Sequence, residues 1–356
     1  MGRQGPRALL LLVLLVLTAC GRPGPPVAPE RVSPQPAIDL IAVVVDGGVE
    51  LAFTLPTRRA DNARLRDLVR VHLFRTEDDG AGDPKPALVD GGRIAGYAEI
   101  AAIRVAEPAP AVLARGRMTF VDRATPTPGR HYTYVVLAED ARGHVSPPSS
   151  RLSVTLIPVP LAPAAVRATP GDREVRVEWR PPARLADGTP VAENFVYQVL
   201  RGTGDEPLDV VTNTAAGATS FVDRSVENER PYAYAVRASR TARGTTARSA
   251  ASERVTATPV DTTPPGPPTE LVAIPSEGAV RLAWVAGPDP DVARYIVYRG
   301  REGAALERVG STTAPATTFT DRNVPSGRWR YAVSAQDTSS RANESRPSPE
   351  VTVTVP

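Results

Sequence analysis

The sequence predicts an all-β protein built from three β-sandwiches in tandem. Apolar and polar residues alternate with a period of two in short segments, which is typical of half-buried strands. The same set of segments recurs three times, about one hundred residues apart. The 356 residues also include 38 prolines and 27 glycines, which favour many turns over long helices.

Composition places the chain among folded proteins and limits its partners. Hydrophobic residues make up 42% and charged residues 23%, and the length suffices for two or three cores. The chain has 42 basic and 39 acidic residues, and two of the basic ones, Arg3 and Arg7, lie in the N-terminal leader. The remaining 40 against 39 give no concentrated positive charge, so we expect no nucleic-acid partner.

Residues 1–19 have the layout of an export signal. A positively charged start is followed by an unbroken apolar run, residues 8–17, and then by the small residues Thr18 and Ala19. Ten apolar residues form about 15 Å of helix, roughly half of a bilayer's hydrocarbon core. The leader is therefore too short to span a membrane and is expected to be removed.

Cys20 is the only cysteine, so no disulfide can form within the chain. The stretch LTACG, residues 17–21, resembles the bacterial lipobox. That resemblance implies cleavage before Cys20 and a diacylglycerol on its thiol, hence a lipid anchor in the cell envelope. Gly21 stands where the inner-membrane retention signal has Asp, which implies the outer membrane in a bacterium with two membranes. An ordinary secretory leader that ends in cysteine is the alternative.

Residues 20–36 read as a proline-rich tether. Six prolines fall within residues 21–37, a composition that cannot bury a core. In polyproline II geometry, at about 3.1 Å per residue, such a segment reaches roughly 50 Å. A merely disordered terminus is the alternative and differs only in stiffness.

Three landmarks recur along the rest of the chain and define its first, second and third copies. The first landmark is a strand with an aromatic residue at or near its end, and the second is an aliphatic strand that ends in arginine. The third is the motif Phe-x-Asp-Arg, which precedes an aromatic strand. The distance from Phe120 to Phe221 is 101 residues, and from Phe221 to Phe319 it is 98. A period near one hundred is the size of a domain, so each copy should have its own core. The landmark strands cover residues 49–53, 175–179 and 280–284, then 71–75, 197–201 and 295–299, and the aromatic strands start at Tyr132, Tyr232 and Trp329.

Alternation within these strands predicts which side chains face a core. In the aromatic strand of the second copy, Tyr232, Tyr234, Val236 and Ala238 fall on one face. The other two copies repeat the pattern from Tyr132 and from Trp329. Short antiparallel strands with glycine and proline turns predict sandwiches, with a barrel as the competitor.

With these residues, each copy resembles a fibronectin type III domain, a kind of immunoglobulin-like sandwich. The resemblance rests on an early core aromatic (Phe53, Trp179, Trp284) and on a corner tyrosine (Tyr132, Tyr232). The third copy has Trp329 at the corner, where the indole N–H could replace the hydroxyl. The predicted domains are residues 37–158, 160–259 and 266–356, with proline-rich connectors at 158–166 and 259–269.

The first copy departs from the other two by an insertion. From the arginine of the second landmark to the phenylalanine of the third there are 20 residues in the second and third copies but 45 in the first, from Arg75 to Phe120. Because loops on a rigid sandwich often bind partners, we expect residues 76–118 to carry the specific contact and to be removable. The alternative is that YAEIAAIRV, residues 97–105, forms an edge strand.

No residue is predicted to be catalytic or to bind a metal or a cofactor. The histidines have no zinc spacing, the acidic run after Arg75 has no EF-hand spacing, and two aspartates of the third copy read as turn residues. The residues considered were His72, His131 and His144, then Glu77, Asp78, Asp79 and Asp83, and finally Asp289 and Asp291.

Two function classes follow from these features. The first is a non-catalytic surface lipoprotein that binds an envelope protein or polysaccharide, or acts as a spacer. The second is a carbohydrate-active enzyme or lectin-like protein with its site in the enlarged first copy. The enzyme would need two of the carboxylates Glu77, Asp79 and Glu99 within roughly 5 to 10 Å of each other.

Overall fold

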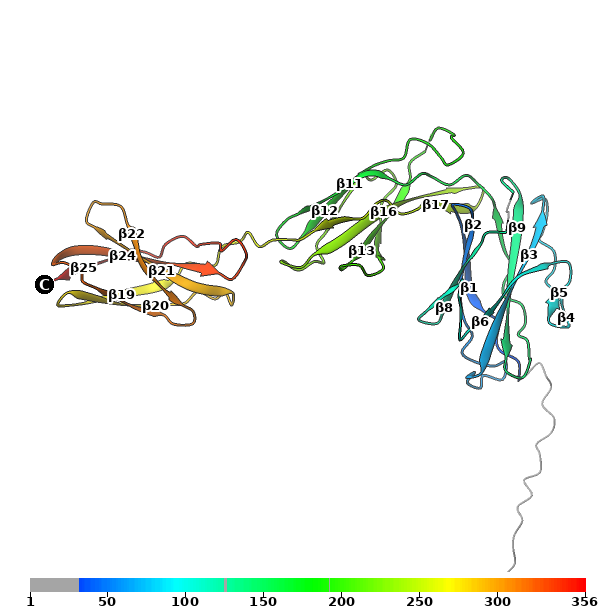
Figure 1. Cartoon of the computed structure of the whole chain (residues 1–356), viewed down its shortest axis with the longest axis horizontal. Coiled ribbons are helices and arrows are strands. Elements are labelled where there is room, and N and C mark those ends of the chain that lie inside the picture. The colour runs from blue at the N-terminus through cyan, green and yellow to red at the C-terminus, as the bar shows by residue number, and fades with distance from the viewer. Residues whose placement is uncertain (1–31, 125–126, 192) are drawn as a thin grey trace, which may run out of the picture. The chain divides into compact units, whose positions relative to one another are not determined.

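The computed structural model describes residues 32–124, 127–191 and 193–356, and all of its named elements are β-strands (Figure 1). Cys20, the leader and the tether up to residue 31 lie outside the described residues. The described chain divides into two compact units. One lies within Met1–Ala42, Leu51–Ala124 and His131–Ser153, and the other consists of Val43–Glu50, Thr125–Arg130 and Val154–Pro356. No helix in the described ranges is long and apolar enough to cross a bilayer.

The first copy is a sandwich of two sheets with a small additional hairpin. On one side, four strands of a larger, nine-stranded sheet have the order β1 (Ile38–Val45), β2 (Gly48–Thr54), β8 (Arg117–Asp122), β7 (Val112–Ala114). The other has the order β10 (Leu152–Thr155), β9 (His131–Asp140), β3 (Leu68–Asp78), β6 (Ala98–Arg104). The hairpin pairs β4 (Val89–Asp90) with β5 (Arg93–Ile94).

The second copy combines a three-stranded sheet with a larger one. The smaller sheet has the order β11 (Ala164–Pro170), β12 (Val175–Arg180), β15 (Ser220–Asp223). In the larger sheet, β14 (Asp209–Asn213) pairs with β13 (Val196–Gly202), which pairs with β16 (Tyr232–Ala242). Both β17 (Thr245–Arg248) and β18 (Val255–Ala257) pair with β16.

The third copy repeats this plan. Its sheets have the orders β19 (Thr269–Ser276), β20 (Ala279–Val285), β23 (Thr318–Arg322) and β22 (Glu307–Thr313), β21 (Val292–Arg301), β24 (Gly327–Asp337), β25 (Val351–Val355). The prediction of an all-β fold made of successive β-sandwiches is confirmed.

The predicted core aromatics are buried between the sheets. Trp179 lies 5.2 Å from Tyr197 and Trp284 lies 5.3 Å from Tyr295 between ring centroids, so the same aromatic pair stands in the second and third cores. In the first copy Phe53 and Tyr134 are fully buried. Alternation in the aromatic strands therefore identified the inward face correctly.

Each copy also contains a buried ion pair between the arginine of the second landmark and the aspartate of Phe-x-Asp-Arg. The N–O distance is 2.7 Å for Arg75 and Asp122, 2.8 Å for Arg201 and Asp223, and 2.9 Å for Arg299 and Asp321. Each aspartate also accepts a hydrogen bond from a buried tyrosine hydroxyl, and burial raises the pKa of that tyrosine. The tyrosines are Tyr134, Tyr234 and Tyr331. Two of the landmarks thus mark one buried triad, which is structural.

The corner residues close their bends through different atoms. In the second copy the Tyr232 hydroxyl accepts from the backbone N–H of Glu227 at 3.0 Å. In the third copy Nε1 of Trp329 donates to the carbonyl of Pro325 at 2.8 Å. The prediction that the indole N–H replaces the hydroxyl is confirmed.

Candidate functional site

Part of the insertion in the first copy is an edge strand. Residues 98–104 form β6, which pairs with β3 so that Val71 is opposite Ile103 and Leu73 is opposite Ala101. This is the place that β14 and β22 occupy in the other copies. The alternative interpretation of YAEIAAIRV as an edge strand is therefore confirmed.

The part of the insertion that precedes β6 covers the outer face of the sheet. Four buried residues, Phe74, Ile94, Val135 and Leu137, form an outer cluster, against which Ala87, Tyr97 and Val145 pack. Val135 and Leu137 belong to β9 but point away from the main core, since their neighbours Tyr134 and Val136 point into it. The insertion thus builds a second, small hydrophobic core on the outside of the first sandwich.

Polar contacts hold the insertion on this face. The Tyr97 hydroxyl donates to the carbonyl of Lys85 at 2.7 Å, and the Arg151 guanidinium donates to the carbonyls of Pro84 and Lys85. The expectation that residues 76–118 form a removable loop is therefore wrong. Their removal would take away β6 and would leave the apolar side chains of the outer cluster in water.

A groove of about 550 Å³ lies between the β4–β5 hairpin and the loop that follows β9. Two apolar side chains on the hairpin side of the groove are exposed, Leu88 by 66% and Val89 by 42%. The residues that line it include no Phe, Tyr or Trp; they are Ser33, Ala87, Leu88, Val89, Gly143, His144, Val145, Ser146, Pro147 and Pro148. The sequence could not predict this groove, because it depends on how two distant loops approach each other.

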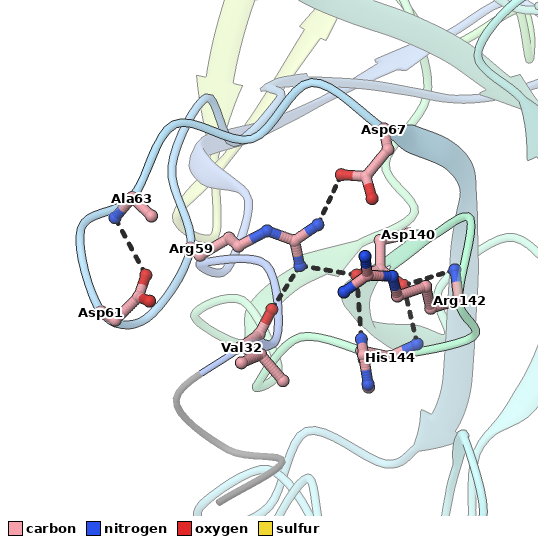
Figure 2. A network of polar contacts seen from close by, with 8 residues as sticks. All are labelled: Val32, Arg59, Asp61, Ala63, Asp67, Asp140, Arg142 and His144. Carbon is pink, nitrogen blue, oxygen red and sulfur yellow. Dashed lines mark hydrogen bonds and ion pairs between the residues drawn. The ribbon is translucent and has the colours of Figure 1, made fainter. Parts of the chain in front are cut away.

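A buried aspartate organises the loops beside the groove (Figure 2). Asp140 accepts hydrogen bonds from Nη1 of Arg59 at 2.6 Å and from Nδ1 of His144 at 3.0 Å, as well as from the backbone N–H groups of Arg142 and His144. Burial would raise the pKa of Asp140, but the hydrogen bonds from Arg59 and His144 outweigh it and hold the pKa well below its usual range.

Arg59 extends this network to the point where the described chain begins. Its guanidinium also donates to Asp67 at 2.5 Å and to the carbonyl of Val32 (Figure 2). Arg59 therefore fixes three segments together: its own loop at residues 58–64, the loop after β9, and the backbone at Val32 that precedes the first strand.

All three histidines are paired with carboxylates in the first copy. His72 lies between Glu99, at 2.7 Å from Nδ1, and Glu139, at 2.9 Å from Nε2. Nδ1 of His131 lies 2.6 Å from Oδ1 of Asp78, and His144 contacts Asp140 as described above. These pairs could not be predicted from the sequence, because the pairing depends on strand register and loop conformation.

The carboxylates that an enzyme would need do not converge. Glu77 is opposite Tyr132, whose side chain points into the sandwich, whereas Glu99 is opposite Phe74 on the outer face. Directly opposed residues share a face, so Glu77 and Glu99 lie on opposite faces of the sheet. Asp79 lies in the loop after β3 and accepts the backbone N–H of Ala81 at 2.9 Å, as in an Asx turn.

The remaining acidic candidates make local contacts. Asp78 accepts the N–H of Gly80 at 2.8 Å in addition to its contact with His131, and Asp289 accepts the N–H of Gly266 at 2.7 Å. Across the described parts of the chain, no group of three or more His, Cys, Asp or Glu side chains is arranged to hold a metal ion.

Comparisons with known proteins find similarity over part of the chain. Exoglucanase B of Cellulomonas fimi is 32% identical over 237 residues, which cover 63% of this chain and 20% of that protein. Endoglucanase B of the same organism is 33% identical over 233 residues, covering 59% and 20%. The matched region is thus about a fifth of each relative. No family model matches the chain.

Among solved structures, the FN1–FN3 domains of chicken CNTN1 align with 90% of this chain and 99% of their own. The sequence identity is 17% and the TM-score is 0.27.

Proposed function

We propose that this protein is a non-catalytic lipoprotein of the cell envelope that binds a protein or polysaccharide partner through its first sandwich. In this proposal Cys20 carries the lipid anchor, the proline-rich segment is the tether, and the second and third sandwiches set reach and orientation. The observation that carries the proposal is the asymmetry among the copies. Among the described residues, the first copy alone has an insertion that forms an outer cluster and an apolar groove beside exposed Leu88 and Val89.

The non-catalytic part of the proposal is supported by the placement of the carboxylates. Glu77 and Glu99 point to opposite faces of their sheet, and Asp79 is used in a turn. The match to the two glucanases over a fifth of their length agrees with a shared accessory region. Since those relatives are named as glucanases, a glucan is the first polysaccharide to test as a partner.

The binding face is tested by changing an exposed groove residue in the mature protein. Leu88→Glu places a charge on a side chain that is 66% exposed, so the fold should tolerate it, whereas an apolar contact would be lost. We expect the variant to lose retention on an insoluble glucan or capture of an envelope protein by at least tenfold, whichever the unchanged protein displays.

A matched control is available in the third copy. Val272 is 52% exposed on β19, so Val272→Glu adds the same charge to a sandwich that the proposal treats as a spacer. Equal losses from both variants would contradict a binding face on the first sandwich, and so would full retention by Leu88→Glu.

The anchor is tested separately by Cys20→Ser in a bacterial host. The lipobox resemblance implies that the variant stays uncleaved or leaves the membrane fraction. Membrane association and processing identical to those of the unchanged protein would rule out the lipid anchor.

A further inference from the structure

His72 bridges two strands through both of its ring nitrogens. It lies on the outer face of β3, opposite Leu137 of the outer cluster, with β9 on one side and the edge strand β6 on the other. Nδ1 is 2.7 Å from a carboxylate oxygen of Glu99 on β6, and Nε2 is 2.9 Å from a carboxylate oxygen of Glu139 on β9. The imidazole side chain is only 15% exposed.

The two contacts together require two N–H donors, and a neutral imidazole has only one. A carboxylate only accepts hydrogen bonds, whereas a neutral imidazole has one N–H donor and one lone pair. Both contacts are therefore hydrogen bonds when the ring carries two protons. When it loses one, a lone pair faces a carboxylate and one of the two contacts must open.

The charged groups around His72 indicate which contact opens. Glu139 is also bound by Arg70 of β3 at 3.1 Å, so it keeps a partner. Arg104 of β6, opposite Arg70, contacts Glu107 at 3.9 Å. For Glu99, which is 35% exposed, His72 is the one ion-pair or hydrogen-bond partner that the described residues provide. The contact between His72 and Glu99 therefore opens at lower cost than the contact with Glu139, and the Glu99 carboxylate turns into water.

Glu99 connects this proton to the insertion. It is the second residue of β6 and lies two residues after Tyr97, which packs against the outer cluster and donates to the carbonyl of Lys85. As an edge strand, β6 is hydrogen-bonded on one side, to β3, so the contact with His72 adds to a limited set of attachments.

We propose that His72 is a proton-dependent latch that fastens β6 and the adjoining insertion to the sheet when doubly protonated and loosens them when neutral. The latch rests on the proposed binding face only for its consequence, because the insertion that adjoins β6 contributes Leu88 and Val89 to that face. Because the closed latch holds one proton more than the open one, lower pH favours the closed latch and higher pH favours the open one.

Amide hydrogen exchange of the mature protein tests the latch with an internal reference. The strand β14 has the edge position of β6 in the second copy and contains no histidine. The ratio of β6 to β14 protection therefore cancels the intrinsic pH dependence of exchange. Between pH 5.5 and pH 8 we expect this ratio to fall about tenfold, as for the loss of one charged hydrogen bond.

Three variants make the test decisive. His72→Gln should give a ratio that no longer changes with pH. Glu99→Gln should also give a flat ratio but at the higher level, because an amide can bond to either form of the ring. His131→Gln removes the other strand histidine, which contacts Asp78 and not β6, and should leave the wild-type profile unchanged.

A ratio independent of pH in the unchanged protein would overturn the latch. A pH profile that persists in His72→Gln, or one that disappears in His131→Gln, would also overturn it. Partner binding is not part of the readout, so failure of the proposed binding face would leave this test intact.

Discussion

The first and second sandwiches share their interior and differ on one outer face. Inside, the arginine, aspartate and tyrosine triad has nearly the same geometry, with N–O distances of 2.7 Å in the first and 2.8 Å in the second. Outside, the aromatic strand of the first copy presents Val135 and Leu137 to the insertion. The second copy has Ala235 and Arg237 at these positions, and no comparable insertion precedes its edge strand.

This difference separates what the repeat preserves from what one copy has gained. The triad and the core aromatics recur because each sandwich must bury the same face. The apolar outer face occurs together with the insertion that covers it, so the two form one structural addition. A specific activity of this protein is best sought on that addition.

The largest expected effect tests the shared interior. Replacing the triad aspartate, as in Asp223→Ala, leaves Arg201 and the Tyr234 hydroxyl without their buried acceptor. We expect a loss of about 3 to 5 kcal/mol in the free energy of unfolding of that sandwich. Asp122→Ala should cost a similar amount in the first sandwich.

Urea titration with pulsed hydrogen exchange and mass spectrometry reports the unfolding of each sandwich from its own peptides. Tyr234→Phe is the control, since it removes a single hydrogen bond and should cost about 1 kcal/mol. A loss below about 1 kcal/mol in one copy and above 3 in the other would show that the common triad does not serve a common role.

The next effect tests the outer face, where the copies should diverge. Leu137→Ala opens a cavity in the outer cluster and should cost about 2 to 3 kcal/mol, towards the low end because a cluster of four buried residues can partly collapse. Arg237→Ala at the matched position of the second copy should change stability by less than about 1 kcal/mol. The same titration measures both, and equal costs would remove the distinction between the two faces.

The sequence was sufficient for most of the interior but not for the outer face. Period-two alternation identified Tyr134 and Val136 as core residues, and the repeat identified Arg75 and Asp122 as landmarks before their pairing was visible. The signal for the outer cluster was present too, because Val135 and Leu137 interrupt the alternation with apolar residues. Recognising what covers them required the path of residues 79–97, which loop sequence does not determine.

The candidate site was predictable only as a location. The extra length between Arg75 and Phe120 indicated where the first copy differs. The prediction of a removable loop failed there, because residues 98–104 form the edge strand β6. His72, Glu99 and Glu139 come from three strands, β3, β6 and β9. Their side chains meet because of the order of these strands in the sheet and the register of their pairing. A groove between two loops depends likewise on tertiary contacts, such as those of Arg59 and Asp140, that no local pattern reveals.

A smaller effect appears at acidic pH and again separates the copies. The hydrogen bonds of Arg59 and His144 keep the pKa of Asp140 low despite burial. The ionised Asp140 therefore stabilises the folded first sandwich above the pKa of an unfolded aspartate, near 3.9, and this stabilisation is lost as the pH falls below that value. At the matched position the second copy has Arg240. Between pH 5 and pH 2 the first sandwich should lose about 1 to 2 kcal/mol from this source, and the second none.

Asp140→Asn identifies the source of that loss. The variant should be less stable than the unchanged protein at neutral pH, because Arg59 loses one of its two charged acceptors and keeps only Asp67. Its first sandwich should also lack this component of the acid dependence. Unfolding is followed by the same titration at each pH with the labelling pulse held at one fixed pH. An unaltered acid profile in Asp140→Asn would assign the loss to another carboxylate.

The smallest effect concerns the corner of the third sandwich, where a tryptophan stands in for the tyrosine of the second. Trp329→Phe removes the hydrogen bond from Nε1 to the carbonyl of Pro325 but keeps an aromatic face beneath Arg299 and Arg301. We expect a cost of about 1 kcal/mol, measured by the same urea titration from exchange in peptides of the third sandwich. Trp329→Tyr should cost less than Trp329→Phe if a hydroxyl can close this bend as Tyr232 does in the second copy. If Trp329→Tyr costs as much as Trp329→Phe, the bend of the third sandwich is shaped for the indole, and the two corners are separate solutions rather than interchangeable ones.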